Sequence, residues 1–317
     1  MKQSSTLLRG LAVAAAAALA LVTTGFSKPT SAPVKSQPIR LVDDIGQTVV
    51  LPRPATRIVT LEPSNAEIAL DLGLKRDIVG TDTSTFEYTP PPWNRELRGL
   101  HSIGPSYPGI NVEEVVAAKP DLVIASEGID GLSALRTFHI PVLILEPESV
   151  AGVYHDILLV GEATGRTAAA ERIVAQMKQQ MAEIEAAVKR VKSRPTVFYD
   201  LGDLYTAGPH SFVNSLIDMA GAVNIGAFLS KQPYPQVTAE QVVKADPEDI
   251  LIDPDATTIA REKRYAGFSA ITAVKTGHIY ALPNSSYVNE PSPALVMGLE
   301  ELVRLLHPGL KLPRLNS

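Results

Sequence analysis

Two glutamates occupy matching positions in a stretch of sequence that occurs twice. Glu113 opens the segment EEVVAAKPDLVI, and Glu240 opens the similar segment EQVVKADPEDILI. Each segment predicts a short helix, a proline stop and a buried strand, with the glutamate in the first helical turn. An acid at this place stabilises the helix dipole by about 0.3–1 kcal/mol, which is one explanation for both residues. The alternative is that two lobes each display one carboxylate, an arrangement that could dock on a two-fold symmetric partner carrying basic side chains.

Tyrosines are concentrated in loops that follow predicted strands or lie between predicted lobes. Ligands of open α/β sheets bind at such loops, and a flat ring with a polar tip suits a large ligand of mixed polarity. Packing inside the protein is the alternative for any single tyrosine. Five of the nine tyrosines are predicted to line a ligand-binding cleft: Tyr88, Tyr107, Tyr205, Tyr234 and Tyr287.

Metal ions and catalysis are not favoured by the remaining polar residues. The six histidines include no pair at i, i+4 spacing and form no histidine-rich loop, so no metal site is predicted. His101 and His210 fall in predicted cleft loops and could ligate the metal of a bound chelate, although surface or capping roles are favoured. No G-x-S-x-G, P-loop or G-x-G-x-x-G motif follows a strand, and no catalytic residue is predicted. The acidic pairs 200/203 and 253/255 keep a metal-dependent enzyme as a less favoured alternative.

The elements that must position these residues alternate between strand and helix. Such alternation predicts an α/β fold in which mostly parallel sheets carry helices on their faces. A hairpin is predicted around Asp43–Gly46, ahead of the first sheet. Buried strands are expected at 57–61, 77–82, 121–126 and 141–146, and again at 196–202, 249–253 and 278–283.

One predicted helix begins with a capping box. Ser64 is followed three residues later by Glu67, a pair that starts helices by satisfying two free backbone N–H groups. Gly73 is expected to end this helix as its C′ residue.

A long amphipathic helix is predicted between two similar halves of the chain. Residues 166–193 contain no Gly or Pro, and apolar side chains recur there at steps of three and four. The helix would be roughly 40 Å long and could join two lobes as a rigid strut. The predicted organisation is an N-terminal α/β lobe at 39–165, the connecting helix at 166–193 and a C-terminal α/β lobe at 194–317.

The first residues and the composition predict export. Lys2 and Arg9 precede an apolar run of about 12 residues that is too short to span a bilayer, so residues 1–27 are expected to be a cleavable signal peptide and 28–38 a flexible linker. The chain contains no cysteine, hence no lipobox cysteine and no disulfide. A net charge of −5 without a basic block is unfavourable for nucleic acid or an anionic membrane as partner. We expect a monomer in the periplasm or another extracytoplasmic space.

Four segments resemble one family of transport proteins. The segments are DDIGQTVVLP, RIVTLEPSNAEIALDLG, NVEEVVAAKPDLVI and YPQVTAEQVVKADPEDILI. Together they are similar to the periplasmic binding proteins for cobalamin, ferric siderophores and haem, and the likeness extends over nearly all of the chain from about residue 39. It implies two Rossmann-like lobes joined by one long helix with a cleft between them, and delivery of a bulky metal chelate to an ABC permease dimer with its ATPase subunits. It further implies that Glu113 and Glu240 pair with arginines of the permease, that the chelate is cargo rather than a resident cofactor, and that the protein is not an enzyme.

The identity of the cargo is left open between related chelates. In the resemblance, Tyr107 falls where cobalamin-binding members have a cleft aromatic, whereas haem-binding members place their axial tyrosine at the position of Ser106. A corrinoid such as cobalamin is therefore favoured, with a ferric siderophore or haem as the alternative. The arginines that could hold a siderophore are those at 95, 98, 261 and 264.

Overall fold

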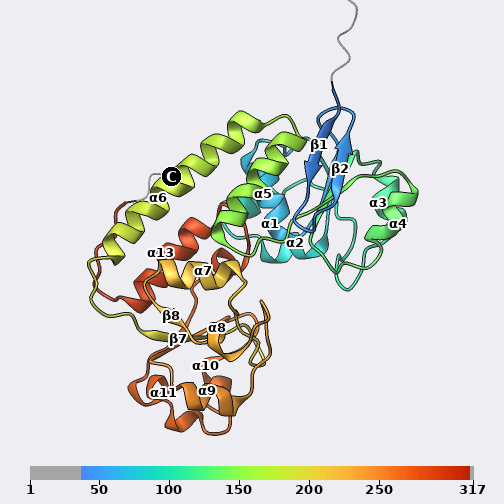
Figure 1. Cartoon of the computed structure of the whole chain (residues 1–317). Helices are drawn as coiled ribbons and strands as arrows, with labels where there is room; N and C mark the ends of the chain where they lie inside the picture. The colour runs from blue at the N-terminus through green and yellow to red at the C-terminus, as the bar shows by residue number, and fades with distance from the viewer. Residues whose placement is uncertain (1–36, 315–317) are drawn as a thin grey trace, which may run out of the picture. The chain divides into compact units, whose positions relative to one another are not determined.

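Two four-stranded parallel sheets form the framework of the protein (Figure 1). The computed structural model describes residues 37–314. In the N-terminal lobe the strand order is β4-β3-β5-β6, and in the C-terminal lobe it is β10-β9-β7-β8. Every neighbouring pair within these two sheets is parallel, which confirms the predicted two-lobed α/β fold. The strands are β3 Ile58–Leu61, β4 Ile78–Thr81, β5 Leu122–Ala125, β6 Val142–Ile144, β7 Thr196–Asp200, β8 Val223–Asn224, β9 Asp249–Ile252 and β10 Ile279–Ala281.

The burial of the strands explains their composition. β3, β5, β6 and β9 are buried along their whole length, as expected for parallel strands that helices cover on both faces. By contrast, β1 (Ile39–Val42) and β2 (Thr48–Leu51) form an antiparallel hairpin, and β2 alternates between exposed and buried residues. Gly46 takes a positive φ of 76° in the turn between them. The predicted hairpin is therefore confirmed.

Short helices connect the strands in each lobe. Those of the N-terminal lobe are α1 Pro63–Asp71, α2 Thr83–Tyr88, the 3₁₀ turn η1 Trp93–Arg95, α3 Val112–Ala117 and α4 Leu132–Thr137. Those of the C-terminal lobe are α7 Phe212–Met219, α8 Gly226–Leu229, α9 Ala239–Ala245, α10 Ile259–Glu262, η2 Phe268–Ala270, α11 Thr272–Thr276, α12 Ser286–Asn289 and α13 Leu295–Leu306.

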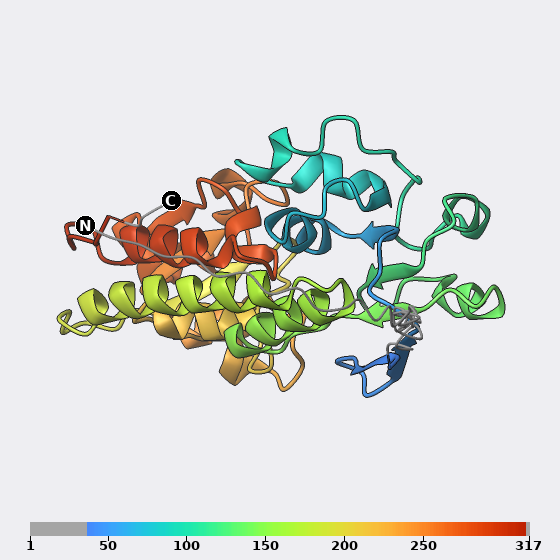
Figure 2. The same ribbon diagram turned by 90° about the horizontal axis from the view of Figure 1, so that it is seen from above.

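Two helices run between the lobes, where the sequence predicted one. α6 (Thr167–Val188) has 22 residues, so it is about 33 Å long and ends before the predicted boundary at 193. It ends because the amides of Arg190 and Val191 bond to carbonyls only three residues back, which tightens the last turn. α5 (Val150–Ala163), which was not predicted, packs along α6 (Figure 2). Their close approach requires Gly161, since a Cβ there would lie 2.4 Å from the Cβ of Ala170.

The start of α1 differs from the prediction. The capping box at Ser64 is wrong, because the helix begins at Pro63 with Glu62 at the N-cap and no side-chain cap. Ser64 and Glu67 are both buried inside the helix, and Glu67 accepts a hydrogen bond from Ser292 of the other lobe. The predicted end is correct, as Gly73 follows the C-cap with a φ of 73°.

The predicted signal peptide at 1–27 and all but the last two residues of the predicted linker at 28–38 lie outside the described residues. Within residues 37–314, none of the helices is both long and apolar enough to cross a membrane.

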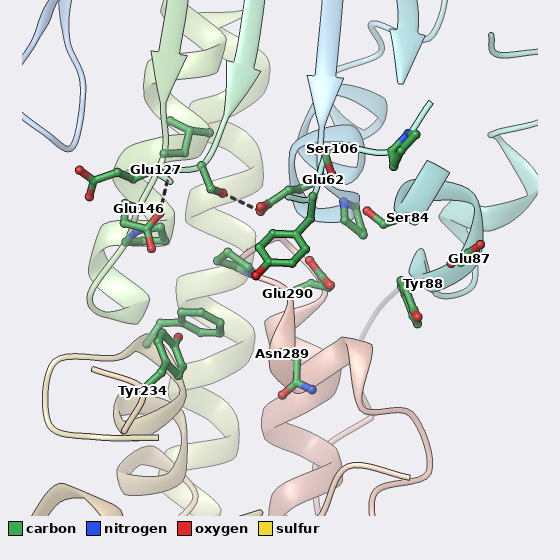
Figure 3. A pocket seen from close by; sticks show the side chains of 18 of the residues that line it. Glu62, Ser84, Glu87, Tyr88, Ser106, Glu127, Glu146, Tyr234, Asn289 and Glu290 are labelled. Atoms are coloured by element: carbon green, nitrogen blue, oxygen red, sulfur yellow. Dashed lines mark hydrogen bonds between the residues drawn. The ribbon is translucent and has the colours of Figure 1, made fainter. Parts of the chain in front are cut away.

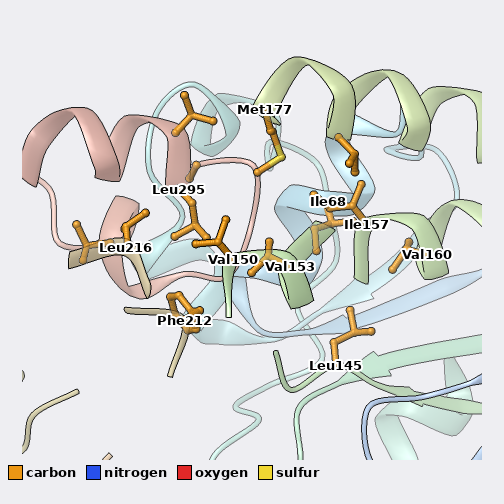
Figure 4. Close-up of a cluster of buried hydrophobic side chains, with 14 of the residues drawn as sticks. Ile68, Leu145, Val150, Val153, Ile157, Val160, Met177, Phe212, Leu216 and Leu295 are labelled. Atoms are coloured by element: carbon orange, nitrogen blue, oxygen red, sulfur yellow. The ribbon is translucent and has the colours of Figure 1, made fainter. Parts of the chain in front are cut away.

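One apolar core extends through both lobes (Figure 4). It is built by α1, α5 and α6 together with α7 and α13, so the lobes share buried surface instead of meeting only at a linker. Each lobe also has a smaller core of its own on the other side of its sheet. Members of the shared core include Ile68, Val153, Ile157, Met177, Phe212, Leu216 and Leu295.

We predict that truncating one residue of the shared core destabilises both lobes together. Ile157 on α5 is fully buried, so Ile157→Ala should lower the free energy of unfolding by about 2–5 kcal/mol while thermal unfolding remains one transition. His155→Ala, at an exposed position of the same helix, is the matched control and should change it by less than about 0.5 kcal/mol. Calorimetry that resolved a second transition, with one lobe unaffected by Ile157→Ala, would contradict a shared core.

Candidate functional site

The carboxyl ends of four neighbouring strands build one wall of a cleft. Glu62 follows β3 directly, Asp82 follows β4, Ser126 follows β5, and Glu146 lies two residues after β6. These strands are adjacent and parallel, so the side chains at their ends lie at one edge of the sheet (Figure 3). This edge is the usual position of a ligand in an open α/β sheet.

The opposite wall of the cleft comes from the C-terminal lobe. Phe212 at the start of α7, Tyr234 in a loop, and Asn289 and Glu290 at the end of α12 complete the lining. The cavity between the two walls has a volume of about 700 Å³, within the range of small-molecule sites. A ligand in this space would contact both lobes at once.

Asp82 is the buried residue that holds the two tyrosines of the first wall, Tyr88 and Tyr107, in place. Its Oδ2 accepts hydrogen bonds from Ser106 Oγ at 2.8 Å and from the Ser84 amide at 3.2 Å, and its Oδ1 accepts one from Thr85 Oγ1. These bonds cap α2, which ends at Tyr88, and fix the loop that carries Tyr107. One carboxylate therefore positions two aromatic side chains of the cleft.

Five glutamates line the cleft, and none of the lysines, arginines and histidines between residues 37 and 314 does so. Glu62 accepts a hydrogen bond from Ser126 Oγ at 2.6 Å, and Glu146 accepts one from the Glu127 amide at 3.2 Å. Neutral donors thus hold these carboxylates. None of the ion pairs found among residues 37–314 includes any of the five, which are Glu62, Glu87, Glu127, Glu146 and Glu290.

Burial in the cleft raises the pKa values of several of these glutamates. Burial raises the pKa of Glu62 to about 7 against the opposing hydrogen bond from Ser126, and the negative charge of Glu146 adds to the rise. Burial and the charge of Glu62 raise the pKa of Glu290 to about 8, although the Ser64 amide donates to it. Burial also raises the pKa of Glu146. Near neutral pH the Glu62–Glu290 pair is partly protonated, as expected for like charges in a confined space.

α12 and the segment that follows it connect the lobes through polar contacts. Tyr287 Oη donates to the carbonyl of Pro91 at 2.8 Å, and Ser292 Oγ donates to the buried carboxyl of Glu67. Glu290 lies between these two contacts and accepts from the N-terminus of α1. The mouth of the cleft is therefore fixed by the residues that connect the two lobes.

The structure brings three of the five predicted tyrosines into the cleft. Tyr88, Tyr107 and Tyr234 line it, and Tyr107 is the most exposed at 83%. Tyr205 is outside the lining residues, and its backbone forms a bridge with Gln236. Tyr287 is also outside the lining, because its ring packs on the shared core and its hydroxyl bonds to Pro91.

The other singled-out residues lie away from the cleft. Glu113 and Glu240 are exposed in the first turns of α3 and α9, whose N-caps are Asn111 and Thr238, so each lobe displays one of these glutamates. Among residues 37–314 no cluster of three or more His, Asp or Glu side chains is arranged to hold a metal ion. The lining residues do not include His101 or His210. They also do not include the arginines at 95, 98, 261 and 264.

The cleft glutamates were missed, although part of the signal was in the sequence. Glu62, Glu127 and Glu146 each come at or next to the end of a predicted strand, where side chains of parallel sheets meet a ligand. No local pattern marks Glu290, which reaches the site from the other lobe.

Two parallel-sheet lobes that share a core and enclose a cleft between the strand ends of the first sheet and the loops and helix ends of the second lobe define a bilobed solute-binding protein. The chain belongs to the periplasmic binding protein family, whose model matches residues 58–286. The members of this family are transport substrate-binding proteins.

Individual relatives agree with this classification. The chain is 31% identical over 282 residues, 86% of either chain, to YvrC of Bacillus subtilis (strain 168), named an ABC transporter substrate-binding lipoprotein. It is 32% identical over 283 residues to a cobalamin-binding protein of Halobacterium salinarum, covering 86% of this chain and 75% of that one. Among solved structures, an ABC-type Fe³⁺-hydroxamate transport protein of Saccharomonospora viridis is similar with a TM-score of 0.73 and 25% identity, over 85% of this chain and 99% of that chain.

We predict that removing the charge of Glu290 stabilises the protein at alkaline pH. Its pKa rises from 4.5 to about 8 on folding, so between these values the folded state holds a proton that the unfolded state releases, and stability falls as pH increases. Glu290→Gln keeps an acceptor for Ser64 and should raise the free energy of unfolding at pH 8 by on the order of 2 kcal/mol, with little effect at pH 4.5. Glu148→Gln, at an exposed position outside the lining, is the control. Denaturant unfolding at both pH values tests this, and an equal change at the two would contradict it.

Proposed function

We propose that the chain is the substrate-binding protein of an ABC importer and that its cargo is a corrinoid such as cobalamin. The observation that carries the proposal is the lining of the cleft, which combines aromatic rings with carboxylates and, within the described part of the chain, contains no basic side chain. Corrinoids present a flat ring edged with primary amides, whose N–H groups are donors for carboxylate oxygens. The similarity to a cobalamin-binding relative supports the same cargo.

The lining is less suited to the alternative cargoes. Haem carries two propionates and many ferric siderophores are anionic, so positive side chains would favour such cargoes, and none of the residues between 37 and 314 that line the cleft is basic. The arginines at 95, 98, 261 and 264, which could have held a siderophore, are outside the lining. A ferric siderophore and haem are therefore the comparison ligands for the test below.

The remaining parts of the proposal follow from a role in ABC-dependent import. The protein acts outside the cytoplasm as a monomer, carries the chelate as cargo without a resident cofactor, and has no enzymatic role. Its partners are a permease dimer and the attached ATPase subunits. Glu113 and Glu240 are proposed as the docking residues, because each is exposed on a separate lobe and outside the cleft.

We predict that cyanocobalamin binds in the cleft and that its affinity depends on the tyrosines that line both walls. Calorimetric titration of the mature protein with cyanocobalamin, haemin and a ferric hydroxamate in parallel should give the tightest binding for the corrinoid. Tyr234→Ala should weaken it about tenfold or more, since a buried aromatic contact is lost. Tyr205→Ala removes a similarly exposed ring outside the cleft and should leave the affinity unchanged. Tighter binding of haemin or the hydroxamate would overturn the cargo assignment.

We predict that reversing both docking charges abolishes uptake without affecting cargo affinity. In Glu113→Lys/Glu240→Lys the lobes would repel basic permease side chains, while the cleft is unaltered. Uptake of labelled cobalamin by cells carrying the cognate importer should fall to background, whereas the dissociation constant measured by calorimetry stays within about twofold. Glu114→Lys, beside Glu113 on α3, is the matched control. Normal uptake by the double variant would refute the docking assignment.

A further inference from the structure

The charge of the cleft is an unusual feature that the corrinoid assignment does not by itself require. The glutamates come from the two lobes and share one cavity of about 700 Å³, yet none of the positive side chains among residues 37–314 lines it. Uncompensated acids in a confined space oppose folding, as the raised pKa values of Glu62 and Glu290 reflect. Tyr88, Tyr107 and Tyr234 line the same cavity, so the acids belong to the candidate ligand site.

The carboxylates are held so that they can face a ligand. Ser126 Oγ fixes Glu62, and the amides of Ser64 and Glu127 fix Glu290 and Glu146. All three donors are neutral, so they orient the carboxylates without cancelling their charge. Acceptors held in this way favour a ligand that brings positive charge or N–H donors and repel one that brings negative charge.

We propose that the glutamates of the cleft select the cargo by charge, so that cationic corrinoids, which lack the nucleotide phosphate, bind more tightly than neutral cobalamins. The proposal rests on the corrinoid assignment above and names the class of corrinoid. Cobinamides are members of this class, because loss of the phosphodiester leaves the positive charge of the cobalt–corrin centre without its internal counter-charge. At an effective dielectric constant near 20, one added charge several ångströms from the Glu62–Glu290 pair changes affinity by about 10-fold to 100-fold.

The same charges make binding depend on pH. A cation beside the pair stabilises the ionised forms, so binding releases protons and affinity for a cationic corrinoid increases from pH 6 to pH 8.5. Every charged or titratable group identified around the pair is acidic or phenolic, and none of these residues supplies a positive charge. These groups are Asp82 from the end of β4, Glu146 from the end of β6, Glu67 from α1 and Tyr234 from its loop.

The test compares ligands and variants in one cycle at pH 8 and low salt. Cyanocobalamin (neutral) and aquocyanocobinamide (cationic) are titrated into the wild-type mature protein and into Glu62→Gln/Glu290→Gln. We expect the wild type to bind the cobinamide about 10-fold to 100-fold more tightly than the cobalamin, and the double variant to lose most of that preference. Glu148→Gln, exposed and outside the lining, should keep the full preference. Comparing the preference, not one affinity, separates charge from the contacts that the missing nucleotide would have made.

The outcomes distinguish the two proposals. If both corrinoids bind and the preference is absent, or is unchanged in the double variant, charge selection is wrong and the corrinoid assignment stands. If neither corrinoid binds, the corrinoid assignment fails. Ferrioxamine B, a cationic ferric hydroxamate, is then titrated into the wild type and the double variant. Charge selection is retained if ferrioxamine B binds the wild type and the double variant binds it at least tenfold more weakly. Any other result overturns charge selection. Circular dichroism and thermal unfolding confirm that each variant is folded.

Discussion

The apolar contact between the two lobes is the constraint on which the cleft depends. α5 and α6 pack against α1 of one lobe and against α7 and α13 of the other, so one core spans both. A close-packed interior does not deform continuously, and it therefore holds the strand ends of the first sheet opposite Phe212 and Glu290. The contacts of Tyr287 and Ser292 with the first lobe add polar restraint at the same place. The result is a cavity whose walls are held in place by the packing of the two lobes, which lowers the ordering cost of binding.

The acidic side chains of the cleft favour ligand binding and lower the folding stability of the free protein. Its carboxyl groups are confined together without a basic partner in the part of the chain that the structure describes, and burial raises the pKa of both Glu62 and Glu290. A protein selected for stability alone would have neutral or paired side chains at these positions. Residues that destabilise the free protein are expected where a bound ligand supplies the positive charge or hydrogen-bond donors that the protein lacks. The serine and backbone donors around the acids fix their orientation and leave that role to the cargo.

Local sequence patterns predicted some elements of the fold correctly and missed others. The buried strands and the hairpin were predictable because β-branched and leucine runs between turn residues are local features. α5 was missed because Gly152 and Gly161 interrupt the helical pattern, although Gly161 is needed for the close contact with Ala170 of α6. The capping box at Ser64 failed since Glu290 of the other lobe takes over the helix N-terminus. Loop tyrosines look alike in the sequence, yet Tyr234 faces the cleft whereas Tyr287 joins the shared core.

The sequence by itself determined seven of the eight strands of the two parallel sheets, the presence of two similar lobes, the family and the paired glutamates Glu113 and Glu240. Each of these depends on residues close together in the chain or on a motif that recurs. Only the tertiary structure decided which loops meet, because contacts such as that between Glu67 and Ser292, 225 residues apart, exist only after the lobes have packed. The acidic character of the cleft belongs to this second group. It arises when Glu62 and its neighbours at the strand ends are brought opposite Glu290 by a core that no local pattern describes.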